Sequence, residues 1–152
     1  MRLRRVMLAA LVMVAIASAA RSRPTLPVAG ADPSLNLHAP PPVMSTLRRA
    51  CVDCHSDETH WPWYATLPIA SHLIERDVAE ARGQLNLSRW AQYNPFDRAD
   101  LLDKMCQLAS TGQMPPWPYR LMHAGARLSA SDVAALCAWS QDEATHLIQE
   151  NR

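Results

Sequence analysis

Apolar residues recur at helical spacing in four stretches of the chain, and no stretch alternates apolar and polar residues as a strand would. The stretches run over Val43–His55, Ile69–Gly83, Asp97–Ser110 and Ser129–Gln149. We therefore predict an all-α fold with four main helices. Because the connections between them are long, we expect something in the middle of the domain to organise its loops.

The expected ends of these helices follow from capping chemistry. Asp97 is the expected N-cap of the third helix, and Ser129 with Asp132 has the spacing of an acidic capping box at the start of the fourth. Gly83 and Gly112 are placed to end the second and third helices. The expected inward faces are Leu73, Ile74, Val78 and Ala81 in the second helix, Leu101, Leu102, Met105 and Leu108 in the third, and Val133, Leu136, Cys137, Ser140 and Ala144 in the fourth.

The start of the chain has a different pattern. Residues 1–20 combine a basic beginning, an uncharged apolar run of about fifteen residues and small residues at Ala17–Ala20, which is typical of a signal peptide. The run is short for a membrane span, so cleavage near Ala19 or Ala20 is expected, with an uncleaved anchor as the alternative. Residues 21–42 are rich in proline and predict an extended tether, which leaves 43–152 as the folded domain.

Composition narrows the class of protein. The chain has 152 residues, of which 49% are apolar, enough for one packed domain. Its formal net charge is +1, and the basic residues beyond the first five positions are scattered among acidic ones. We therefore expect no nucleic-acid partner.

Candidate chemistry is concentrated in Cys51-Val-Asp-Cys54-His55, the Cys-X-X-Cys-His sequence of covalent haem attachment. Two thiols one helical turn apart can add to the two vinyl groups of one porphyrin, and the adjacent imidazole can then ligate the iron. The predicted cofactor is one haem c. An exported all-α domain is the context in which this motif is expected.

Three other interpretations of the cysteines stay open at this stage. A thioredoxin-like dithiol would follow a strand, and no strand is predicted. A zinc site would need two further ligands, for which Cys106 and Cys137 are available but lie far apart in the sequence. A disulfide between Cys51 and Cys54 would leave His55 without a role.

Met114 is the favoured sixth ligand of the iron. It follows Gly112 in a loop stiffened by Pro115, Pro116 and Pro118, which lowers the entropy lost on ligation. His123 is the main alternative. His60, His72 and an open site are also considered, and Met114 could instead be an ordinary packing residue.

The remaining candidates are weaker. Trp61, Trp63, Tyr64, Trp117 and Tyr119 could border a haem or be ordinary core aromatics, whereas His38 and His146 are expected in solvent. In an oxidising compartment Cys106 and Cys137 could form a disulfide worth about 3 kcal/mol, or remain buried thiols.

Several separated segments resemble one family in order: Cys54-His-Ser-Asp-Glu-Thr-His-Trp-Pro-Trp-Tyr64, Asp77 to Trp90, Gly112-Gln-Met-Pro-Pro116 and Tyr119-Arg-Leu-Met-His123. They are similar to the haem-binding domain family of bacterial exported proteins, and the resemblance covers nearly all of 43–139. Ala81 departs from it, since glycine is expected there. The resemblance implies a cytochrome c-like haem domain, sometimes found beside other cytochrome or peroxidase-type domains, and does not establish a reaction.

These observations predict an exported, periplasmic electron carrier rather than an enzyme, soluble or anchored through residues 1–20, with an unidentified redox protein as its partner. A sensor or peroxidase-like accessory domain with an open distal site is the second hypothesis, and a haem that serves only as a structural staple is the third.

Overall fold

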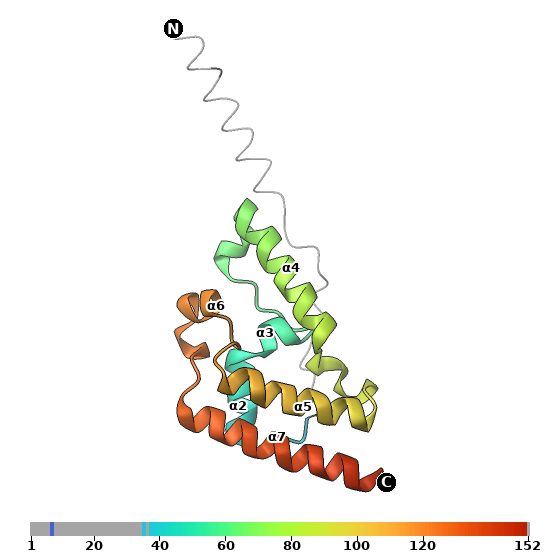
Figure 1. Cartoon of the computed structure of the whole chain (residues 1–152). Helices are drawn as coiled ribbons and strands as arrows, with labels where there is room; N and C mark the ends of the chain where they lie inside the picture. Colours follow the sequence, from blue (N-terminus) through green and yellow to red (C-terminus); the bar gives the residue numbers. More distant parts are fainter. Residues whose placement is uncertain (1–6, 8–34, 36, 152) are drawn as a thin grey trace.

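The computed structural model describes Met7, Leu35 and residues 37–151, and in this part of the chain the regular elements are all helical (Figure 1). The predicted all-α fold is therefore confirmed. The predicted signal or anchor segment lies outside the described residues except for Met7. None of the described helices combines the length and the apolar composition that a membrane span needs.

The helices are α2 (Pro41–Ala50), α3 (Val52–His55), α4 (Pro68–Gln84), α5 (Pro95–Ser110), α6 (Trp117–Met122) and α7 (Ala130–Glu150), with 3-10 turns η1 (Trp63–Thr66), η2 (Leu87–Gln92) and η3 (Ala124–Ala126).

The helices α5 and α7 lie side by side and antiparallel, and form the base of the domain (Figure 1). Their contact buries Leu102 and Leu136 completely or nearly so. Cys106 and Cys137, for which a disulfide and two buried thiols were both considered, are joined by a disulfide with a Cα–Cα distance of 4.8 Å. The helix α2 packs against α7, so the core extends to the start of the described domain.

The ends of α7 and α5 were predicted with different success. Ser129 caps α7 in a reciprocal capping box with Asp132, as expected. The cap of α5 is Asn94, whose side chain accepts from the backbone N–H of Asp97 at 2.9 Å, so the assignment of Asp97 as the cap was wrong. The reason is Pro95, which fits the first helical position and starts the helix two residues earlier. Gly112 follows α5 with φ 69°, the left-handed conformation expected there.

The first expected helix is two helices separated at Cys51, whose φ of −126° is not helical. The packed part of the chain also begins earlier than Val43. Leu35 and Leu37, which the sequence analysis assigned to the tether, are each 4% exposed and belong to the core. Leu35 and Leu37 therefore attach this proline-rich segment to the core of the domain.

The helix α4 differs from its prediction in two respects. Gly83 lies inside its last turn, and the chain turns extended only at Leu85. Of the expected inward face Val78 is buried, whereas Leu73 is 47% exposed and Ile69 at the start of the helix is 80% exposed. Helical spacing shows which residues share a face, but not whether another element covers that face.

The helix α6 was not predicted, because its sequence Trp-Pro-Tyr-Arg-Leu-Met was interpreted as part of a proline-rich loop. Pro118 lies in the first turn, where the missing N–H costs no intrahelical bond. No residue of this short helix is buried. Its Tyr119 forms the polar and ring contacts that hold it against the rest of the domain.

Candidate functional site

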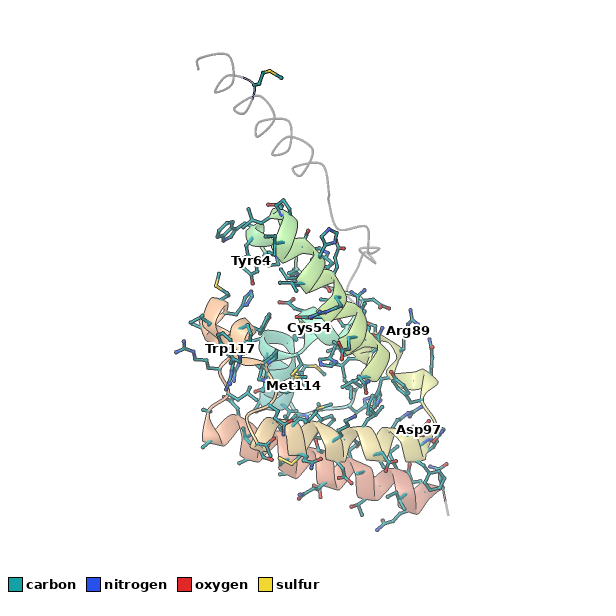
Figure 2. All side chains as sticks on the ribbon, turned by 45° about the horizontal axis from the view of Figure 1, so that its top comes forward. Cys54, Tyr64, Arg89, Asp97, Met114 and Trp117 are labelled. Carbon is teal, nitrogen blue, oxygen red and sulfur yellow. A yellow bond between two sulfur atoms is a disulfide. The ribbon has the colours of Figure 1, made fainter. Side chains whose placement is uncertain are left out.

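A cavity of about 430 Å³ lies between α3, α4 and the α5–α7 pair, and it collects the principal candidate residues. Its volume is within the range of cofactor pockets. Cys51, Cys54, His55 and Met114 all border it. In Figure 2 the labelled Cys54 and Met114 lie between the ribbon of α4 and that of α5. The apolar part of the wall is formed by Leu47, Ala50, Ala81, Leu85, Leu87, Leu101, Met105, Leu108, Ala109, Pro115, Pro116, Leu128 and Leu136.

The cysteines of the Cys-X-X-Cys-His sequence are free thiols. Burial is the largest cause that raises the pKa of Cys51 to about 12 and that of Cys54 to about 11. A thioredoxin-like nucleophile has the opposite property, a lowered pKa that maintains the thiolate. The surroundings therefore disfavour the dithiol interpretation, and the free thiols do not form the Cys51–Cys54 disulfide that was considered.

His55 is oriented by one backbone contact. Its Nδ1 lies 3.0 Å from the carbonyl oxygen of Leu85, and because a carbonyl only accepts, Nδ1 carries the proton. The pKa of His55 is lowered, and burial is the largest cause. The neutral form of the ring is therefore favoured. Nε2 then retains a lone pair, which is the arrangement of a metal-ligating histidine held by a second contact.

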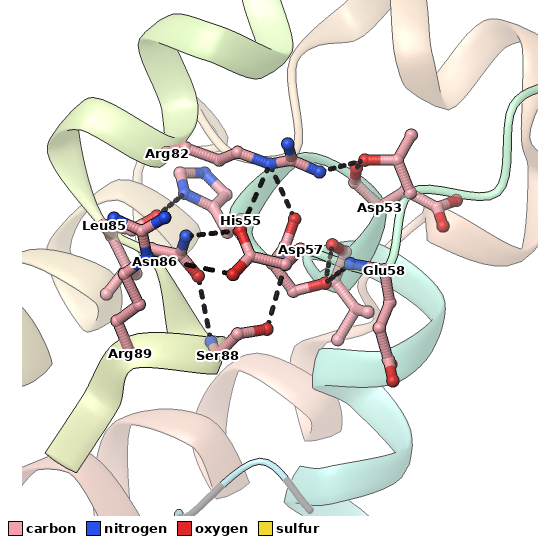
Figure 3. A network of polar contacts seen from close by, with 12 residues as sticks. Asp53, His55, Asp57, Glu58, Arg82, Leu85, Asn86, Ser88 and Arg89 are labelled. Atoms are coloured by element: carbon pink, nitrogen blue, oxygen red, sulfur yellow. Dashed lines mark hydrogen bonds and ion pairs between the residues drawn. The ribbon is translucent and has the colours of Figure 1, made fainter. Parts of the chain in front are cut away.

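A polar network connects the segment after His55 to the end of α4 (Figure 3). Arg82 donates to the carbonyl oxygen of Ser56 at 2.7 Å and to the hydroxyl of Thr59 at 2.9 Å. Asn86 donates to Asp57 at 2.9 Å, and the backbone N–H of Asp57 donates to the Ser88 hydroxyl at 3.0 Å. No sequence pattern predicted this network, because its two sides lie about thirty positions apart and come together only in the fold.

Met114 borders the cavity from the loop that follows α5, and it is 39% exposed. Its backbone N–H and that of Gln113 each donate to the carbonyl oxygen of Leu108 at 3.0 Å. The loop is therefore fixed to the end of α5. Met105, which the sequence placed on the inward face of α5, brings a second thioether to the cavity wall.

The alternative histidine ligands lie elsewhere, since none of them borders the cavity. His123 uses both ring nitrogens: Nδ1 donates to the Tyr119 carbonyl at 3.1 Å, and Nε2 accepts from the Tyr64 hydroxyl at 3.3 Å. The His60 side chain is 86% exposed and contacts Asp53, and His72 is exposed on α4.

Of the aromatic candidates, Tyr119 borders the cavity, whereas Trp63 and Trp117 are exposed and do not. Asp53 was missed in the sequence analysis as a site residue, although it accepts a hydrogen bond from the Tyr119 hydroxyl at 2.8 Å.

A zinc interpretation has no support in the described residues, which contain no group of three or more His, Cys, Asp or Glu able to hold a metal ion. Its two further candidate ligands, Cys106 and Cys137, are consumed by their disulfide.

A family model described as a haem-binding domain matches residues 9–142, which is most of the chain. No curated protein and no solved structure matches the chain.

Proposed function

The chain belongs to the haem-binding domain family, and from that premise we propose that it is an exported mono-haem c-type cytochrome that transfers electrons. The observation that carries this proposal is the convergence of Cys51, Cys54, His55 and Met114 on one apolar cavity. Two thiols, an imidazole and a thioether are the donor set of a covalently attached haem with two axial ligands.

The residues of the cavity fit such a group by their chemistry. Cys51 and Cys54, which are free thiols at the cavity wall, would hold haem c through thioether bonds. His55 would offer Nε2 to the iron, while the Leu85 carbonyl holds the ring by Nδ1. Bound haem would supply one-electron chemistry between ferric and ferrous iron. The apolar wall would limit access of water to it.

Met114 supports electron transfer over the sensor or peroxidase-like alternative. A thioether in the sixth position leaves no vacancy for a small molecule and raises the reduction potential. Peroxide chemistry commonly uses a distal cationic and basic pair, and among the described residues that border the cavity the only lysine or arginine is Lys104 and the only histidine is His55. The open-site alternative therefore depends on Met114 lying off the iron.

The pattern of residues 1–20 supports the remaining parts of the proposal, export to the periplasm and exchange of electrons with a redox protein there. Either cleavage near Ala20 or retention as an anchor is consistent with it. Sequencing the N-terminus of the protein recovered from the periplasmic and membrane fractions tests both, and accumulation of the full-length, haem-free chain in the cytoplasm as the working form would refute export.

The proposal is tested by replacing each set of donors in the protein produced with haem-attachment machinery. Cys51→Ala with Cys54→Ala should abolish haem staining on a denaturing gel, whereas the matched pair Cys106→Ala with Cys137→Ala should retain it. Staining that survives the first pair of changes would refute covalent attachment at this motif.

The sixth ligand is tested by a second matched pair, Met114→Leu and Met105→Leu, which remove one thioether each with little change of volume. The ferric wild type should be low-spin with a weak long-wavelength sulfur-to-iron band. Met114→Leu should lose the band, bind carbon monoxide readily and have a lower reduction potential. Loss of the band in Met105→Leu alone would show that Met105 of α5 is the ligand instead. A high-spin wild type that binds carbon monoxide at once would favour the sensor hypothesis.

A further inference from the structure

The segments on the two sides of Met114 are held in place in different ways. On its N-terminal side, the backbone bonds from Gln113 and Met114 to Leu108 fix the loop to α5. On its C-terminal side the chain passes through Pro115 and Pro116 into α6. The position of Met114 therefore depends on how α6 is held as well as on α5.

Apolar packing does not hold α6. No residue of the helix is buried, and Trp117, Leu121 and Met122 are 69%, 64% and 54% exposed. A segment with so few buried contacts belongs to the low-stability end of a domain. Its attachment must come from specific polar and ring contacts.

The most direct of these contacts joins α6 to α3. The Tyr119 hydroxyl donates to Asp53 Oδ2 at 2.8 Å, and Asp53 lies between the two candidate haem cysteines. Tyr119 is partly buried and also borders the cavity. Burial, followed by this hydrogen bond, raises the pKa of Tyr119, so its hydroxyl remains a donor. A hydrogen bond to a carboxylate is stronger than one between neutral groups.

A second contact supports Tyr119 from the other side. Its ring stacks on His123 with centroids 4.1 Å apart, and His123 in turn accepts from Tyr64. This chain connects η1 to the end of α6. This series of contacts does not reach α3. Among the hydrogen bonds of the described residues, the one from Tyr119 to Asp53 ties α6 to the helix carrying Cys54 and His55.

We propose that Tyr119 and Asp53 are positioning residues whose hydrogen bond holds α6 against α3 and so keeps Met114 at the cavity. The role of Met114 as a ligand rests on the proposed function, whereas the attachment of α6 does not. The bond joins α3, which carries His55, to the helix that follows the loop of Met114.

Tyr119→Phe in the haem-loaded protein tests this, because it removes the hydroxyl and retains the stacked ring. Hydrogen–deuterium exchange over residues 113–122 should become about tenfold faster, the size of effect expected when one hydrogen bond to a carboxylate is lost. Carbon monoxide should bind faster by a similar factor, and the sulfur-to-iron band should weaken while covalent haem is retained.

Three variants give the matched comparison. Asp53→Ala should reproduce Tyr119→Phe, and Asp53→Asn should restore much of the wild-type behaviour because its amide oxygen still accepts. Tyr64→Phe, which removes only the bond to His123, should have a smaller effect. Exchange over 113–122 that is unchanged in Tyr119→Phe, or equally accelerated in Tyr64→Phe, would overturn the proposal. A wild type without the sulfur-to-iron band would instead refute ligation by Met114, and exchange would still decide the role of Tyr119.

Discussion

The α5–α7 pair and the α3–α6 region border the same cavity but are held together by different forces. The first contains fully buried leucines and a disulfide between Cys106 and Cys137. The second contains a helix without a buried residue, attached through Tyr119 and its neighbours. The comparison indicates that stability resides in the α5–α7 pair, whereas the placement of α6 against α3 depends on directional polar bonds. Apolar burial is strong but non-directional, and a hydrogen bond adds little stability but fixes an orientation.

The largest effect on this comparison should come from the disulfide. Cys106→Ala with Cys137→Ala opens a loop that spans 31 positions, and chain entropy predicts a loss of about 3.5 kcal/mol in the free energy of unfolding. Denaturant titration of both proteins measures it. The spectrum of bound haem should be unchanged, because neither cysteine borders the cavity. A protein of unaltered stability would show that the pair is not bonded in solution.

The second prediction compares one leucine from each region. Leu102→Ala in α5 removes a completely buried side chain and should cost about 3 kcal/mol, since it creates a cavity in the core. Leu121→Ala in α6, where the side chain is 64% exposed, should change the free energy of unfolding by less than about 0.5 kcal/mol. Urea titration measures both, and similar costs at the two positions would contradict the contrast between the regions.

An effect smaller than that of Leu102→Ala is expected at the start of α7. Asp132 accepts from the backbone N–H of Ser129 at 2.8 Å and pairs with Arg49 at 2.6 Å, and these hydrogen bonds hold the pKa of Asp132 well below its usual range, with Arg49 as the largest cause. Asp132→Asn should cost about 1 kcal/mol at neutral pH, the usual size of a cap contribution.

The pH dependence of this difference has a definite sign. Because the pKa of Asp132 is lower in the folded protein, its carboxylate stabilises the fold fully above the unfolded-state pKa of about 3.9, and this contribution is lost as the pH falls further. Chemical denaturation of both proteins at pH 7 and pH 3 should show the gap narrowing at the lower pH. A gap that widens in acid would contradict this account.

The success of prediction differed between local and long-range features. The capping box of Ser129 and the turn at Gly112 were predicted because their chemistry is complete within four or five residues. The start of α5 at Asn94 was missed by the same reasoning, since two capping residues competed and Pro95 decided between them. The exposed face of α4 was missed because nothing in its own spacing says that Leu73 lacks a covering element.

The sequence by itself determined the helical class and predicted both the Cys-X-X-Cys-His site and the proline-rich loop of Met114. Periodicity, the spacing of Cys51, Cys54 and His55, and proline chemistry are all local properties. Only the tertiary structure decided that Met114 borders the cavity and that the ring nitrogens of His123 are engaged elsewhere. It also brought the Leu85 carbonyl within hydrogen-bond distance of His55, and Asp53 within hydrogen-bond distance of Tyr119. These contacts join segments 30 and 66 positions apart, and such pairs form only when the packing of the helices has brought them together.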